Sequence, residues 1–155
     1  MSVSPPQVPP GVFAYANRSH FDELDGLNVV HHSRYLKQVE RAQQAMFDRI
    51  METDGFDPER YPDLYAVVRR LDIEYLESIR SVIDYTILLS VERLGEASLT
   101  TRFAFRSPDH AILYARGRRT ICHLSSQTHR PSGWSASFRE RFSRWECDGR
   151  DLKSL

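Results

Sequence analysis

Cysteine is scarce in this chain of 155 residues, and neither sign of charge is in excess. The two cysteines, Cys122 and Cys147, are too few for a disulfide framework and lack the spacing of metal ligands. A reduced, cytoplasmic setting is therefore expected. Lys and Arg together number 21, as do Asp and Glu, so the net charge is zero. This balance argues against a nucleic-acid partner, because a phosphate backbone attracts proteins with a positive excess.

Long apolar runs are also missing from the sequence. No run approaches the ~18–20 residues that a membrane span needs, so no span is expected. The first residues, MSVSPPQVPPG, carry neither the basic region nor the apolar core of a secretory signal. We interpret residues 1–11 as a flexible proline-rich tail and residues 146–155 as a polar C-terminal tail. The remaining residues, 12–145, suit a single domain with one core.

Hydrophobic periodicity predicts one long helix and five strands. Apolar side chains recur at helical spacing from residue 32 to residue 51, in a row that comprises Tyr35, Val39, Ala42 and Met46. Alternating or β-rich segments predict strands at residues 12–18, 69–76, 82–92, 97–106 and 112–124. Near the C-terminus, Phe138, Phe142 and Trp145 recur at helix-like intervals. Short turns favour antiparallel pairing, so we expect an α+β fold with the helix packed on a five-stranded antiparallel sheet.

The segment FDELDGLNVVHHSRYLKQVERA, residues 21–42, is the most informative part of the chain. It resembles the signature of the 4-hydroxybenzoyl-CoA thioesterase-like group of the hotdog fold. In that group an acidic loop leads to an apolar pair, an aromatic residue or His, and a Tyr-Leu step. Residues 67–105 resemble the two central strands and Leu-Gly turn of the group, and TICHLSSQTHRP resembles its last strand. The resemblance covers roughly residues 12–142 and implies a hotdog acyl-thioester hydrolase without a cofactor.

The resemblance places the family's catalytic carboxylate at Asp25. This residue would either attack the thioester carbonyl or take a proton from water, and the sequence does not separate the two roles. Before a glycine, it also fits a simple turn residue. Backbone amides near His32 and Ser33 are expected to form an oxyanion site, because the first amides of a helix lack intrahelical partners. The His32 side chain either orients the carbonyl or a water, or only packs at the helix start.

Further side chains are candidates for substrate binding, namely His31, Arg34, Tyr35, Ser98, Arg116 and Arg118. Arg34 stands where the family usually has a small or amide residue, so it either favours an acidic acyl group or points to solvent. Ser98 either contacts substrate across a subunit interface or hydrogen-bonds within its strand. Arg116 and Arg118 share one strand face and suit the phosphates of coenzyme A, although a solvated face is the simpler interpretation.

Other polar residues of the segment are given structural roles. Asn28 replaces the usual glycine of the loop, and asparagine tolerates a left-handed backbone. Glu23 replaces the first Asp of the motif and, with Asp22, is expected on a solvated face or beside an arginine. Glu40 is expected to pair with Arg41 or with an arginine on a strand. Neighbouring histidines on a helix do not face each other, so no metal site is expected at residues 31–32.

These observations predict a hydrolase whose substrate is an acyl group on coenzyme A or on an acyl-carrier protein. A homodimer or homotetramer is expected, because the group pairs edge to edge and exposed strand edges need covering. A second hypothesis is a non-catalytic acyl-binding protein of the same fold, which the departures at Asn28 and Arg34 allow. A hotdog dehydratase ranks last, since no dehydratase motif is found.

Overall fold

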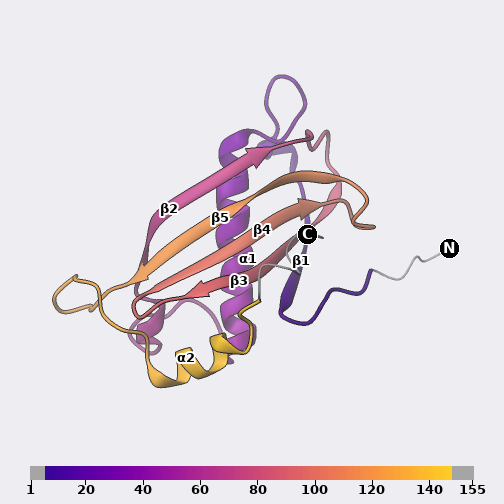
Figure 1. The fold of residues 1–155 in the computed structure, drawn as a ribbon. Coiled ribbons are helices and arrows are strands. Elements are labelled where there is room, and N and C mark those ends of the chain that lie inside the picture. The colour runs from indigo at the N-terminus through magenta and orange to yellow at the C-terminus, as the bar shows by residue number, and fades with distance from the viewer. Residues whose placement is uncertain (1–5, 148–155) are drawn as a thin grey trace.

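The computed structural model describes residues 6–147, and it has the predicted α+β architecture (Figure 1). The five strands are β1 (Val12–Arg18), β2 (Ala66–Tyr75), β3 (Asp84–Leu94), β4 (Ser98–Arg106) and β5 (Leu113–His123). They form one sheet in the order β1-β3-β4-β5-β2, and all neighbours are antiparallel. The helices are α1 (His32–Met51) and α2 (Ala136–Ser143), with short 3-10 turns at Phe21–Glu23 and Pro62–Leu64.

Helix α1 lies across one face of the sheet, with the bounds that the sequence predicts (Figure 1). Its apolar row is buried completely at Val39, Ala42 and Met46, and packs against sheet residues such as Ile87 and Leu89. The helix ends where Glu52 adopts a left-handed conformation with φ 56°. None of the helices in the described part of the chain is long and apolar enough to cross a membrane.

The C-terminal part adds the second helix that the aromatic spacing suggests. Phe138 and Phe142 are buried on α2, and both rings contact Phe47 of α1. On the other face of the sheet, Val8 packs on a small cluster formed by Val12, Leu88 and Ala104. Of the two predicted tails, residues 1–5 and 148–155 lie outside the described residues.

The placement of β2 differs from the expectation. Short turns between consecutive strands favour their pairing, but β2 does not pair with β3 and is instead an edge strand paired with β5. Residues 76–83 instead cross the start of α1, where Ile79 is buried and its carbonyl accepts a hydrogen bond from the Val30 amide at 2.9 Å. The Ser81 amide likewise donates to the Asn28 carbonyl at 3.0 Å. The crossing segment is therefore bound to the loop that precedes the helix.

Candidate active site

The loop before α1 is folded around the Asp25 carboxylate. Its Oδ1 accepts hydrogen bonds from the amides of Leu27 at 2.8 Å and Val29 at 3.4 Å, while the Asp25 amide donates to the Val29 carbonyl at 2.9 Å. Asn28 adopts the left-handed conformation, with φ 58°, that its replacement of glycine requires. Asp25 is thus a turn residue, but its Oδ2 accepts no hydrogen bond within residues 6–147.

The start of α1 is capped by a histidine side chain. His31 Nδ1 accepts the Ser33 amide at 3.3 Å and lies 2.8 Å from Ser33 Oγ, so this amide is already used by the cap. The His31 amide donates to the Glu23 carbonyl at 2.8 Å. The amide of His32 differs, because no acceptor for it is found among the described residues. His32 therefore offers the unsatisfied donor at this helix end.

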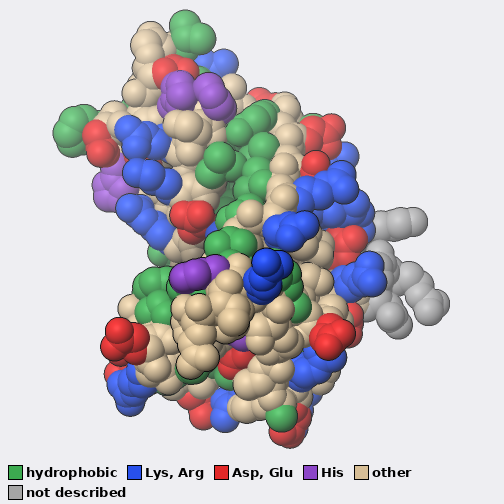
Figure 2. All heavy atoms as spheres, turned by 90° about the vertical axis from the view of Figure 1, so that its left-hand side faces the viewer, with side chains coloured by type: hydrophobic (Ala, Val, Ile, Leu, Met, Phe, Trp, Pro, Cys, Tyr) green, Lys and Arg blue, Asp and Glu red, His purple; other side chains and the backbone are tan. Residues whose placement is uncertain are grey.

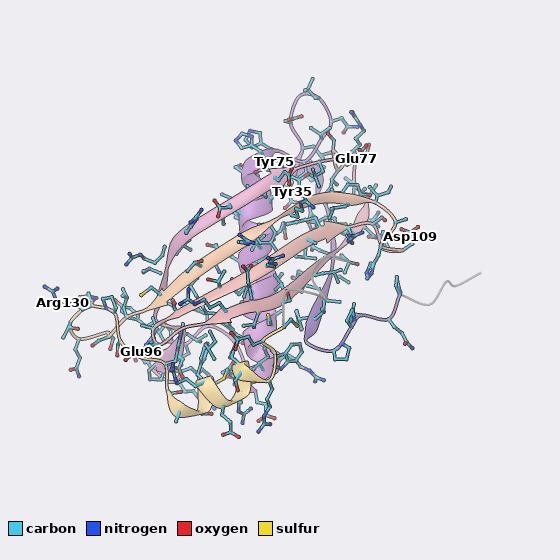
Figure 3. All side chains as sticks on the ribbon, viewed as in Figure 1. Tyr35, Tyr75, Glu77, Glu96, Asp109 and Arg130 are labelled. Atoms are coloured by element: carbon cyan, nitrogen blue, oxygen red, sulfur yellow. The ribbon has the colours of Figure 1, made fainter. Side chains whose placement is uncertain are left out.

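A cavity of about 250 Å³ lies between the loop, the helix start and the end of β2. Its walls are formed by Asp25, Val29, Val30, His32, Tyr35, Tyr75, Leu76, Glu77 and Ser78. The buried Tyr35 ring meets the Tyr75 ring edge to face at 5.1 Å, and Figure 3 shows both beside Glu77. Burial raises the pKa of both tyrosines above the ordinary value.

The buried Glu23 side chain joins the loop to α1. The prediction that this side chain is solvated or paired with an arginine is wrong. The residue is only 8% exposed, and its carboxylate accepts hydrogen bonds from the Gln38 side chain and from the His20 amide at 2.9 Å. Gln38 in turn accepts a hydrogen bond from Asn17 at 2.7 Å. Burial, and next to it the Glu23 charge, raises the pKa of Tyr85 well above its usual range.

The sequence model of the thioesterase-like superfamily matches residues 19–142, which include the loop, α1 and the whole crossing segment. The chain belongs to this superfamily. None of the curated proteins matches the sequence. The superfamily assignment agrees with the hotdog resemblance of residues 21–42.

Solved structures of thioesterases share the hotdog fold of this superfamily member. A predicted thioesterase from Bacillus stearothermophilus has a TM-score of 0.75 at 19% identity, covering 88% of this chain and 98% of its own. A DHNA-CoA thioesterase from Staphylococcus aureus has a TM-score of 0.74 at 16% identity, covering 86% of this chain and 89% of its own. A thioesterase from Thermus thermophilus, complexed with coenzyme A and Zn, has a TM-score of 0.72 at 23% identity, covering 88% and 95%.

Of the residues predicted for the site of this thioesterase-like chain, Asp25, His32 and Tyr35 line the cavity, whereas Arg34 does not. Ser98 lies at the far end of β4. Its carbonyl accepts the Trp134 indole N–H at 3.2 Å. Along β4 it is about 23 Å from Phe105, at ~3.3 Å per residue, and the Phe105 ring contacts Tyr35. Within one subunit, Ser98 is therefore remote from Asp25.

Arg116 and Arg118 lie on the sheet face away from α1, where they pair with Glu74 at 2.9 Å and Glu92 at 3.0 Å. They border a groove of about 810 Å³ that four arginines line. Glu40 pairs with Arg119 at 3.3 Å, which confirms the expected contact with a strand arginine. Within residues 6–147, no group of three or more His, Cys, Asp or Glu side chains is arranged to hold a metal.

Six cavity residues were not predicted as site residues, and Tyr75 and Glu77 are among them. Tyr75 shares a strand face with Leu71 and Ile73, so the alternation indicates that it points toward the helix side. The sequence carries no sign that the end of β2 meets the start of α1, because that meeting depends on the edge position of the strand.

Proposed function

We propose that this protein hydrolyses an acyl thioester of coenzyme A or of an acyl-carrier protein in the 250 Å³ cavity. One observation carries the proposal, which is that the Asp25 carboxylate and the unsatisfied end of α1 at His32 border the same cavity. Membership of the thioesterase-like superfamily supports thioester chemistry. The coenzyme A bound to the Thermus thermophilus thioesterase supports a coenzyme A ester as substrate.

In the proposed reaction, Asp25 Oδ1 keeps the turn in place while Oδ2 takes part in the chemistry. As a nucleophile, Oδ2 bonds to the carbonyl carbon, the C–S bond breaks and the thiolate leaves; water then hydrolyses the anhydride. As a general base, Oδ2 takes a proton from the water that attacks the carbonyl. In both routes negative charge develops on the carbonyl oxygen, and the His32 amide is placed at the helix start to stabilise it.

The assembly that we propose is a homodimer through the free edge of β2, or a tetramer of two such dimers. Exposed apolar side chains follow this strand, with Val67, Val68 and Tyr75 each 45% exposed and Leu76 43% exposed. Figure 2 shows a hydrophobic band on the side of the molecule where β2 forms the sheet edge. Pairing of two β2 edges would cover the unpaired backbone groups and this band together.

The decisive experiment measures thiol release from short, long, aromatic and dicarboxylic acyl-CoA esters by the wild type and by Asp25→Asn. Asparagine keeps an oxygen that accepts the Leu27 and Val29 amides, so the turn is expected to survive. Loss of the carboxylate should lower kcat by about 100-fold or more. Asp22→Asn, on the exposed side of the same loop, is the matched control and should retain activity.

Equal turnover by Asp25→Asn would contradict the role of this carboxylate. Binding of acyl-CoA without thiol release by the wild type would contradict hydrolysis. That result would instead support the non-catalytic acyl-binding function. A panel on an acyl-carrier protein, measured in parallel, separates the two classes of thiol carrier.

A further inference from the structure

The cavity contains a second carboxylate that the proposed reaction does not use. Glu77 is the second residue after β2 and lines the cavity from the crossing segment, which is hydrogen-bonded to the loop that carries Asp25. Its backbone is fixed, because the amides of Leu76 and Glu77 both donate to the Tyr114 carbonyl, at 2.8 and 3.0 Å. The position of Glu77 beside Tyr35 and Tyr75 is visible in Figure 3.

The Glu77 side chain has no evident structural task. It is exposed, and within residues 6–147 its carboxylate makes no hydrogen bond or ion pair. The other acidic side chains of the sheet region behave differently, since Glu74 and Glu92 are each paired with arginines. An unpaired carboxylate in a cavity wall acts on whatever occupies the cavity, because no neighbouring cation neutralises it.

The charge of the cavity is therefore one-sided. Among the described residues that line it, there are two carboxylates and no Lys or Arg. Arg34, the cation nearest to the site along the sequence, is not part of the wall. The expectation that Arg34 favours an acidic acyl group thus finds no support in the cavity of a single subunit.

We propose that Glu77 sets the charge preference of this site, favouring acyl groups with a cationic or hydrogen-donating substituent and rejecting anionic ones. The inference rests on the proposed function, because it takes the acyl group to lie in this cavity. In this proposal Asp25 reacts with the thioester carbon, whereas Glu77, on the crossing segment, acts on the substituent that the acyl chain carries. Discrimination arises from repulsion of the wrong substrate as much as from attraction of the right one.

The test uses thioether analogues of coenzyme A, which cannot be hydrolysed and so report binding alone. We would measure Kd by calorimetry for S-propyl-CoA, S-(2-carboxyethyl)-CoA and S-(3-aminopropyl)-CoA. The wild type should bind the amino analogue more tightly than the carboxy analogue. Glu77→Gln should reduce the ratio of the two dissociation constants by about tenfold, and Glu77→Lys should reverse the preference.

Glu96→Gln is the matched control, because Glu96 is an exposed acid at the other end of the sheet (Figure 3). It removes the same charge and should leave the ratio unchanged. An unchanged ratio in Glu77→Gln, or an equal change in Glu96→Gln, would overturn the inference. Selective binding without thiol release from acyl-CoA would refute hydrolysis but support the charge preference. Failure of all three analogues to bind would refute both.

Discussion

The Tyr75 hydroxyl donates a hydrogen bond to the backbone carbonyl of His32 at 3.0 Å, so the last residue of β2 is tied to the first residue of α1. The same ring packs edge to face on Tyr35. The Tyr75 side chain thus sets the separation between the end of β2 and the start of α1. These two segments form the cavity walls near Glu77 and His32.

Tyr75→Phe should loosen the cavity without collapsing it, because the ring contact with Tyr35 is kept. Loss of one partly exposed hydrogen bond should lower the free energy of unfolding by about 0.5–1.5 kcal/mol. Misplacement of the helix end should lower kcat/KM by about tenfold. Urea unfolding and thiol release measure the two effects, and an unchanged kcat/KM would show that the hydroxyl does not position the site.

Removal of the Glu23 carboxylate should destabilise the protein. Glu23→Ala leaves the buried Gln38 amide without its acceptor, which should lower the free energy of unfolding by about 1–3 kcal/mol. Asp22→Ala, on the neighbouring exposed residue, should change it by less than about 0.5 kcal/mol. Similar values for both variants in urea unfolding would argue that Glu23 does not hold the loop.

A charge on the free edge of β2 should weaken self-association. Val68→Lys places a cation on an apolar part of this edge, and should shift the sedimentation profile toward the monomer. Ile112→Lys is the control, because Ile112 is equally exposed, at 45%, and precedes β5 rather than lying on β2. Dissociation by both variants or by neither would contradict an interface at β2.

The stability of the protein should depend on pH through His110. Burial, and next to it the Arg106 charge, lowers the pKa of this histidine below 6.5 in the folded state. The unfolded chain therefore protonates His110 at a higher pH than the folded chain does. The contribution of neutral His110 to the free energy of unfolding is complete above about pH 6.5 and is lost as the pH falls through the folded pKa.

His110→Asn tests this dependence, since asparagine tolerates the left-handed backbone of this position, where φ is 61°. Between about pH 7.5 and pH 5.5, the variant should lose less free energy of unfolding than the wild type. Parallel urea curves at the two pH values provide the comparison. An equal loss in both proteins would mean that His110 does not contribute.

Local sequence patterns predicted the parts of the fold that depend on residues close together in the chain. The bounds of α1 follow from the apolar row through Tyr35 and Met46, and the α1–sheet contact made by Glu40 follows from its place beside that row. Glu23 was misjudged because an acidic residue in a polar loop resembles a solvated one. Its burial depends on Gln38, fifteen residues later in the chain, which the periodicity alone does not assign to a buried partner.

The remaining part of the site depends on topology. Tyr75 and Glu77 reach the cavity only because β2 lies at the sheet edge and residues 76–83 then cross the start of α1. Short turns between predicted strands favour adjacent pairing, so sequence order alone favoured the wrong neighbour for β2. The position of Asp25 in the cavity wall next to the start of α1 was predictable, because its loop and α1 are contiguous in the chain, while its catalytic role stays a prediction.

The site stays intact only while the crossing segment, residues 76–83, stays bound to the loop before α1. The Val30 and Ser81 amides are both held across the contact between the crossing segment and the loop. Detachment of residues 76–83 would release the loop around Asp25 and the wall with Glu77 at once, while the five strands stayed paired. On heating, activity should then disappear before the sheet melts, and hydrogen exchange at Val30 and Ser81 should accelerate at that same lower temperature.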